Sequence, residues 1–234
     1  MGMMRALNRQ RGYQNSGAHS HDSFLPLFEY DNESTAGGDQ IARHLSTDGI
    51  EILKMWLPAA ELAQDLKRFD PNARFSWPRL IATAARQPGL AACLLFRLQA
   101  ALHAKGHGRT ASWTRGINLS LTGADFVPGC VAGPGLLIRH PNGLVVGEGV
   151  RIGAECTLLH QVTLGERYVD GRAPHLYPVL GNRVTVGAGA KVLGGVTLGD
   201  DCVIGANAVV THDVPSGRVA VGIPARVIPE VNAC

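Results

Sequence analysis

The second half of the 234-residue sequence repeats every six positions, and this period restricts the fold more than any other feature. From position 146 an aliphatic residue recurs at each sixth position, and glycine follows most of these residues. A small or β-branched residue stands four positions after nearly every one. An α-helix repeats about every 3.6 residues and a strand about every two, so neither accounts for the pattern. The aliphatic positions are Val146, Ile152, Leu158, Leu164, Leu180, Val186, Val192, Leu198, Ile204 and Val210.

A six-residue unit suits a coil with flat sides, in which short extended runs alternate with turns. The aliphatic side chain points into the coil and stacks on its equivalent in the next turn, so that the repeats share one continuous core. Glycine serves the turns, where it adopts positive φ angles at little cost. We therefore predict a mainly β fold, a parallel β-helix. The period does not fix its hand, although the general rule for parallel crossovers favours a right-handed coil.

The repeat is interrupted once, between Leu164 and Leu180, where a step of sixteen residues replaces the usual six. The extra residues are expected to form a loop that leaves the coil between positions 166 and 178. An irregular loop on a regular scaffold is a common position for functional residues.

The chain divides into three predicted regions. Residues 1–46 are polar, rich in Gly, Ser, Asn, Asp and His, and without a sustained period, so we predict a disordered N-terminal tail. Residues 47–122 have apolar residues at helical spacing and form the predicted α-helical region. Residues 123–234 form the predicted hexapeptide-repeat domain.

The helical region contains one sustained apolar stripe. Its members Leu90, Leu94, Leu98 and Leu102 recur every four residues, and the pattern leaves Arg97 and Gln99 off the stripe. We expect the stripe to pack against other helices, with a helix lying on a membrane surface as the alternative.

Composition excludes several classes of protein. The net charge is only +3 and the arginines are scattered, which argues against a nucleic-acid partner. The five cysteines are widely spaced without a CxxC pair, which argues against a disulfide framework or zinc site and for a reducing cytoplasm. We see no signal peptide and no apolar run long enough to span a membrane. His19 and His21 with Asp22 fit a solvated tail better than a metal site, so no metal is expected.

Three segments carry a resemblance to a known family. Residues 162–165 read VTLG, residues 186–194 read VGAGAKVLG and residues 222–226 read GIPAR. With Asp-Pro and Pro-Gly landmarks in the helical region, they resemble the serine acetyltransferase family of hexapeptide-repeat acyltransferases. The resemblance implies a left-handed β-helix with an N-terminal helical region. It also implies an acetyl-CoA-dependent O-acetyltransferase that transfers acetyl directly to the hydroxyl group of a small acceptor.

The resemblance implies a catalytic pair, Asp125 and His140. In the family a histidine is the general base for the acceptor hydroxyl, and an aspartate fifteen residues earlier orients it; these two residues have that spacing. A neutral imidazole suits proton removal near pH 7, and a positioned base typically contributes about a hundredfold to ten-thousandfold. A carboxylate on the other ring nitrogen fixes the tautomer and stabilises the imidazolium. The alternative is a loop histidine at an irregularity of the repeat.

The resemblance also implies a groove for acetyl-CoA along the coil. By match to the family, Gly165, Ala188 and Ala206 line the path of the pantetheine arm, and Arg226 lies near the nucleotide end. Small residues at these turns also serve the fold itself, so the two interpretations stay open. Family members form active sites between neighbouring subunits, so we expect a homotrimer, or a dimer of trimers joined by the helical region.

The sequence departs from the family where the acceptor is held. Serine-specific members have an aspartate just before the catalytic histidine, where this chain has Arg139. They also have an Arg-His pair in the extruded loop, where this chain has Leu176 and Tyr177, with His175 close by. Asp70 resembles the aspartate of the helical region that helps to hold the amino acid. Asp70, Arg139, His175 and Tyr177 are therefore the candidate substrate-binding residues.

Alternative functions follow from these departures. Family membership favours L-serine as the acceptor. Arg139 would repel an ammonium group, and like-charge contacts can cost several kcal/mol. Together with Tyr177, it favours the alternative, a sugar hydroxyl in surface polysaccharide synthesis. A hexapeptide scaffold without catalysis is a third hypothesis, against which the intact Asp125 and His140 weigh.

Overall fold

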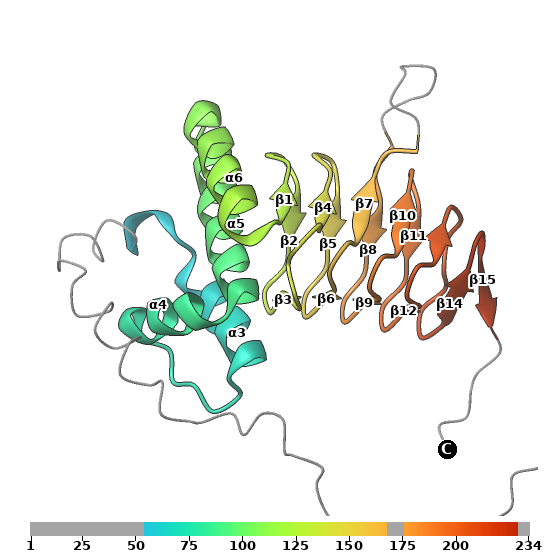
Figure 1. Cartoon of the computed structure of the whole chain (residues 1–234), viewed down its shortest axis with the longest axis horizontal. Helices are drawn as coiled ribbons and strands as arrows, with labels where there is room; N and C mark the ends of the chain where they lie inside the picture. The colour runs from blue at the N-terminus through green and yellow to red at the C-terminus, as the bar shows by residue number, and fades with distance from the viewer. Residues whose placement is uncertain (1–53, 168–175, 229–234) are drawn as a thin grey trace, which may run out of the picture. The chain divides into compact units, whose positions relative to one another are not determined.

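The computed structural model describes residues 54–167 and 176–228, all within one compact unit, Ser34–Cys234. Helices come first and a coil of short strands follows (Figure 1). The helices are α3 (Ala59–Phe69), α4 (Trp77–Arg86), α5 (Pro88–Ala104) and α6 (Gly108–Thr122). The predicted tail, residues 1–46, lies outside the described residues. No helix in the described ranges is both long and apolar enough to cross a membrane.

The coil begins at Asp125, three residues after the end of the last helix, and most of its strands have only two or three residues. They are β1 (Asp125–Phe126), β2 (Val131–Ala132), β3 (Leu137–Ile138), β4 (Val145–Val146), β5 (Arg151–Ile152), β6 (Thr157–Leu158), β7 (Thr163–Gly165), β8 (Val179–Leu180), β9 (Thr185–Val186), β10 (Lys191–Leu193), β11 (Thr197–Leu198), β12 (Val203–Ile204), β13 (Val209–Val210), β14 (Val219–Gly222) and β15 (Ala225–Ile228).

From β1 to β14, successive strands belong to different sheets, as a coil with three flat sides requires. Sheet 1 has the order β1-β4-β7-β10-β13, sheet 2 the order β2-β5-β8-β11, and sheet 3 the order β3-β6-β9-β12-β14-β15. The pairs are parallel except β14 with β15, which form an antiparallel hairpin at the end of the coil. Each turn of the coil, here called a rung, contributes one strand to each sheet. The predicted parallel β-helix is therefore confirmed.

The interior of the coil contains the residues that the period selected. All ten aliphatic positions are buried, with no more than 5% of any of them exposed. The residues four positions later are buried as well, including Cys156 and Cys202. The two cysteines thus occupy equivalent packing positions. The repeat predicts the core because each rung adds the same inward-facing set to it.

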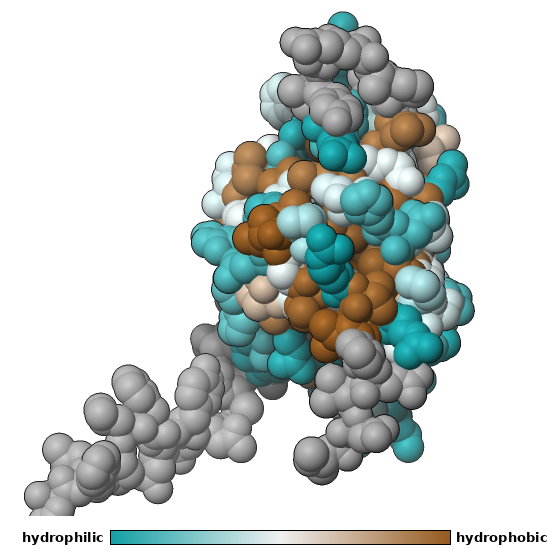
Figure 2. Space-filling view, turned by 90° about the vertical axis from the view of Figure 1, so that its right-hand side faces the viewer, coloured by the Kyte–Doolittle hydropathy of each residue, from teal (hydrophilic) through white to brown (hydrophobic). Residues whose placement is uncertain are grey.

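The C-terminal end of the coil is closed by the β14–β15 hairpin. Figure 2 shows this end of the molecule, where hydrophobic side chains gather on the surface. The hairpin leaves Val221, Ile223 and Val227 exposed. The last rung therefore has apolar surface that the described chain does not cover.

The buried face of α5 differs from the predicted leucine stripe. Leu90 is fully buried, but Leu94, Leu98 and Leu102 are only partly so. Arg97 and Gln99, which the pattern left off the stripe, are 3% and 1% exposed. The stripe is therefore only part of the buried face of the helix, because α5 packs against the first rung of the coil as well as against α6, and that rung needs polar partners.

The first rung has no preceding rung, so its backbone groups on that side lack ladder partners, and buried backbone groups require them. Side chains from the helices supply these hydrogen bonds. Arg97 donates to the carbonyl oxygens of Ala132 (2.5 Å) and Gly133 (2.6 Å). Asp65 accepts a hydrogen bond of 2.8 Å from the Leu136 amide. The helical region therefore caps the open end of the coil.

Arg97 and Asp65 are themselves an ion pair inside this cap. The guanidinium and carboxylate make two hydrogen bonds, of 3.0 and 3.1 Å, and Asp65 is fully buried. Burial opposes the charge of Arg97, but the hydrogen bond and charge of Asp65, with the charge of Glu61, outweigh it and raise the pKa of Arg97. The Arg97 guanidinium thus stays charged while it binds the first rung.

The cap extends to both sides of this pair. Gln99 donates to the Phe126 carbonyl (2.8 Å), and Arg68 donates to the carbonyls of Gly135 (3.1 Å) and Glu155 (2.6 Å). A further close approach occurs at Gly89, where an added Cβ would lie 1.9 Å from the Ile138 carbonyl oxygen. Only glycine permits α5 to begin this close to β3, which ends two residues before His140.

Candidate active site

His140 lies in the turn that leads from β3 in sheet 3 to β4 in sheet 1. This turn is two residues longer than the equivalent turns after β6, β9 and β12. The extra length makes the turn project from an otherwise regular edge, and the His140 side chain is exposed. Backbone hydrogen bonds still fix both ends of the turn. The Arg139 amide donates to the Leu158 carbonyl (2.8 Å), and the Gly143 amide donates to the Gly123 carbonyl (2.9 Å).

A cavity of about 270 Å³ lies between this turn and the helices. The coil contributes the end of β3 and the turn with His140, and the helical region contributes the end of α3 and the start of α5. The lining residues are Arg68, Phe69, Gln87, Pro88, Gly89, Leu137, Ile138, Arg139, His140 and Pro141. A cavity of this size with an exposed imidazole can hold a small acceptor and remove a proton from it.

A second histidine, His160, lies one rung beyond His140. The two rings are edge to face, with centroids 6.1 Å apart and planes at 77°. The Nδ1 atom of His160 is buried and has no hydrogen-bond partner among the described residues. Sequence analysis did not select His160 as a site residue. The repeat could have indicated it, because Leu137 pairs with Thr157 and a histidine follows each of them three residues later.

The same register aligns two residues predicted for the acetyl-CoA groove with the histidines. Thr157 pairs with Thr185, and Thr185 pairs with Val203. The residue three positions after the first residue of β3, β6, β9 and β12 therefore lies on the same edge of the coil in each rung. These residues are His140, His160, Ala188 and Ala206, here called the histidine–alanine column. Neighbouring strands lie about 4.8 Å apart, so the column runs for about 14 Å.

The column becomes more open as it leaves His140. Ala188 is partly buried and Ala206 is exposed. Lys191 lies beside the column, and its ammonium group donates to the carbonyl oxygens of Gln161 (2.5 Å) and Gly189 (3.1 Å). Gly222 on β14 is the next equivalent position of the column, and Val221 directly precedes it. Arg226, exposed on the closing hairpin, pairs with Val221. The structure thus brings His140, Ala188, Ala206 and Arg226 to one edge.

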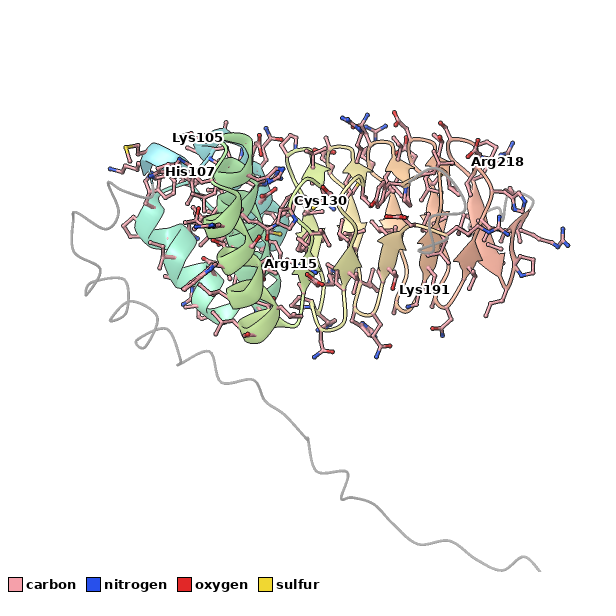
Figure 3. The ribbon with its side chains drawn as sticks, turned by 90° about the horizontal axis from the view of Figure 1, so that it is seen from above. Lys105, His107, Arg115, Cys130, Lys191 and Arg218 are labelled. Carbon is pink, nitrogen blue, oxygen red and sulfur yellow. The ribbon has the colours of Figure 1, made fainter. Side chains whose placement is uncertain are left out.

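Asp125 lies at the start of β1, next to the turn that carries His140. Its amide donates to the Leu144 carbonyl (2.8 Å). Its carboxylate does not bond to His140 in this structure but is bound by Arg115, at 2.5 and 2.7 Å. Arg115 extends from α6 to the first rung (Figure 3), and the hydrogen bond with Asp125 raises its pKa. The orienting role of Asp125 remains a prediction.

Asp70 follows α3, next to the Phe69 that lines the cavity. Its carboxylate accepts a hydrogen bond of 2.8 Å from Arg79 and another of 3.3 Å from the Asn72 amide. Asp70 is not among the residues that line the cavity. The structure therefore brings Arg139, but not the Asp70 carboxylate, to the cavity with His140.

Tyr177 and Gly165 lie at a different corner of the coil, between sheets 1 and 2. Tyr177 stands at the end of the extruded loop, and its ring covers the turn at Gly147 and Gly149 in the preceding rung. Its hydroxyl donates to Glu166, and this hydrogen bond raises the pKa of Tyr177 to about 12. His175 lies outside the described residues. Tyr177 does not line the cavity, so its role toward the acceptor remains a prediction.

The residues of the described ranges include no group of three or more His, Cys, Asp or Glu that would hold a metal ion.

Comparison with known proteins agrees with this architecture. Residues 177–212 match the family described as bacterial transferase hexapeptide (six repeats). Over 171 residues the chain is 43% identical to the serine acetyltransferase of Helicobacter pylori, an alignment that covers 72% of this chain and 96% of that protein. The chain belongs to the serine acetyltransferase family.

Solved structures of the family have the same fold. A soybean serine acetyltransferase complexed with serine is 31% identical, with a TM-score of 0.62, over 73% of this chain and 68% of that one. A serine acetyltransferase in complex with CoA is 28% identical, with a TM-score of 0.62, over 81% of this chain and 73% of that one. The coil is accordingly the left-handed β-helix of this family, and the general preference for right-handed crossovers does not hold here.

Proposed function

We propose that the chain transfers the acetyl group of acetyl-CoA to the hydroxyl group of L-serine, producing O-acetyl-L-serine and CoA. The observation that carries the proposal is the position of His140. Its exposed imidazole lines a cavity and heads the histidine–alanine column along the coil. Family members solved with serine and with CoA support these two substrates.

In the proposed mechanism His140 is the general base. A nitrogen of the neutral imidazole accepts the hydroxyl proton while the serine oxygen bonds to the thioester carbonyl carbon. The carbon–sulfur bond then breaks, its electron pair goes to sulfur, and the imidazolium returns the proton to the CoA thiolate. The enzyme contributes proximity and one proton relay, and no covalent acetyl-enzyme is required.

Asp125 is the proposed orienting residue for His140. The start of β1 and the His140 turn are neighbours, as the hydrogen bonds from Asp125 to Leu144 and from Gly143 to Gly123 indicate. Arg115 now binds the Asp125 carboxylate, and an ionised carboxylate has lone pairs enough for a further donor. We infer that Arg115 holds the Asp125 carboxylate in place beside the His140 turn, where its charge stabilises the imidazolium formed during transfer.

Acetyl-CoA is proposed to lie along the histidine–alanine column, with its thioester at His140. Ala188 and Ala206 leave room for the pantetheine arm to approach the backbone. Lys191 beside the column and Arg226 at its far end supply positive charge for the phosphates of the nucleotide.

The assembly is proposed to be a homotrimer or a dimer of trimers in a reducing cytoplasm. Four cysteines of the described chain are free and buried: Cys93, Cys130, Cys156 and Cys202. Burial raises the pKa of the Cys130 thiol to about 12, so that it stays protonated at neutral pH. Unpaired protonated thiols fit a compartment in which disulfides do not form.

The test is acetyl-CoA-dependent release of free thiol, with L-serine and a panel of saccharides as acceptors. The wild type should turn over L-serine, and His140→Ala should lose a hundredfold to ten-thousandfold in kcat, the usual contribution of a positioned base. Turnover of saccharides without L-serine would reject the proposed acceptor. Equal rates for wild type and His140→Ala would reject catalysis at this site.

A further inference from the structure

Arg139 lines the cavity and directly precedes the proposed general base, His140. Its amide is fixed to Leu158 on the next rung, so the backbone cannot move it away from the cavity without breaking sheet 3. The side chain is exposed and lines the same cavity as His140. In the described chain its guanidinium makes no hydrogen bond or ion pair with another residue.

The other charged groups around the cavity are already bound. The Arg68 guanidinium donates hydrogen bonds to the carbonyls of Gly135 and Glu155 and to the Thr157 hydroxyl (3.0 Å). The carboxylates of the two nearby aspartates, Asp70 and Asp125, are bound by arginines, and neither lines the cavity. None of the described lining residues is acidic. A ligand in the cavity therefore meets one uncommitted cation and no carboxylate.

We propose that Arg139 binds the carboxylate of the acceptor and thereby makes the enzyme select for hydroxy acids; this inference rests on the proposed acetyl transfer at His140. A guanidinium matches a carboxylate with two parallel hydrogen bonds, which fixes orientation as well as charge. Because Arg139 and His140 are adjacent, a hydroxyl and a carboxylate separated by a short carbon chain reach both. L-Serine has this arrangement, and its ammonium group contributes little to binding here.

The proposal reverses the expectation that the family resemblance gives for this position. An aspartate before the catalytic histidine would bind the ammonium group of the acceptor, whereas Arg139 repels it. The residue at position 139 then binds the carboxylate of the acceptor instead of its ammonium group. Serine then remains the acceptor, and the substitution at position 139 changes which of its charged groups is recognised.

Acceptor analogues test this directly in the thiol-release assay with the full-length protein. Glycerate retains the carboxylate and hydroxyl of serine without the ammonium, and serinol retains the ammonium and hydroxyl without the carboxylate. Glycerate should be used within about tenfold of the kcat/KM for L-serine. Serinol should be at least tenfold to a hundredfold poorer, the usual value of a lost charge-assisted hydrogen bond.

Variants identify the residue responsible. Arg139→Gln should raise the KM for L-serine and glycerate about tenfold to a hundredfold without changing the KM for acetyl-CoA or the low rate with serinol. Arg139→Lys should restore part of the loss, because it retains the charge but not the paired geometry. Arg151→Gln, at an exposed arginine on β5, is the matched control and should behave as wild type.

The outcomes separate this inference from the proposed function. If serinol equals L-serine and Arg139→Gln leaves the KM for L-serine unchanged, the role of Arg139 is overturned while acetyl transfer to serine stands. If the wild type turns over neither L-serine nor glycerate, the proposed function fails and this inference fails with it.

Discussion

At the scale of single residues, the glycines of the coil differ in what surrounds them. At Gly187 an added Cβ would lie 2.7 Å from the Ala206 amide nitrogen and the Ile204 carbonyl oxygen, so the fold requires glycine there. At Gly165 an added Cβ would meet no heavy atom of the described chain within 4 Å, and φ is not positive. The described chain therefore gives no packing reason for glycine at position 165, which lies at another corner of the coil than the histidine–alanine column. In the proposed trimer, acetyl-CoA bound on the column of a neighbouring subunit would give one.

We predict that Gly165→Val raises the KM for acetyl-CoA tenfold or more, because a side chain inserted into a filled contact typically costs about 1–3 kcal/mol. The melting temperature should stay within about 2 °C of wild type, since nothing in the described chain is displaced. Steady-state kinetics and thermal unfolding measure both. An unchanged KM for acetyl-CoA would remove Gly165 from the groove.

His160 offers a second test at this scale. Its buried Nδ1 lacks a partner, and an unsatisfied buried polar atom costs about 1–3 kcal/mol. His160→Phe removes this cost while retaining a ring against His140, so thermal unfolding should show equal or higher stability. If His160 also positions His140 through its polar ring, kcat should fall about tenfold with little change in either KM. Unchanged kcat would limit His160 to packing.

At the scale of elements, the sequence predicts the interior of the coil well and the buried face of α5 poorly, for one physical reason. Every inward position of the coil repeats one local environment, so the period of six identifies Val146 and its equivalents as core. The face of α5 depends on a partner far along the chain. Arg97 is buried because the open first rung offers the carbonyls of Ala132 and Gly133, and no spacing within the helix reveals that.

The candidate site divides in the same way. Family spacing selected Asp125 and His140 as candidates, and the six-residue period, applied from β3, would have placed His160 next to His140. The contacts of Asp125 with Arg115 and of Asp70 with Arg79 could not be predicted, because each depends on the direction in which a helix side chain points toward a residue outside its own helix.

The polar cap between helices and coil can be tested by removing one half of its ion pair. Arg97→Met leaves the fully buried Asp65 without its guanidinium partner, and breaking a buried pair in this way costs about 3–5 kcal/mol. Combining it with Asp65→Leu should recover only part of the loss, since the Leu136 amide and the first-rung carbonyls still lack partners. Chemical denaturation measures each free energy of unfolding. A double variant as stable as wild type would show that the cap is dispensable.

At the scale of the whole molecule, apolar surface remains exposed on α6 as well as at the end of the coil. Trp113, Ile117 and Leu121 are four residues apart, so they share one side of the helix, and they are 79%, 49% and 73% exposed. Exposed apolar stripes of this kind are typical of contact surfaces. Together with family membership, they favour an oligomer rather than a monomer.

We predict that light scattering coupled to size exclusion gives three or six times the mass of the chain at micromolar concentration. The reason is the apolar surface that α6 exposes, together with the expectation from the family resemblance that active sites lie between neighbouring subunits. An active monomer at that concentration would contradict both the trimer and the shared site.

The most direct test of the central claim is identification of the product by mass spectrometry after incubation with acetyl-CoA, L-serine and a mixture of neutral saccharides. Wild-type protein should form O-acetyl-L-serine in amounts equal to the CoA released, and His140→Ala should form almost none. Acetylated saccharide without O-acetyl-L-serine, or equal product from wild type and His140→Ala, would contradict acetyl transfer to serine at His140.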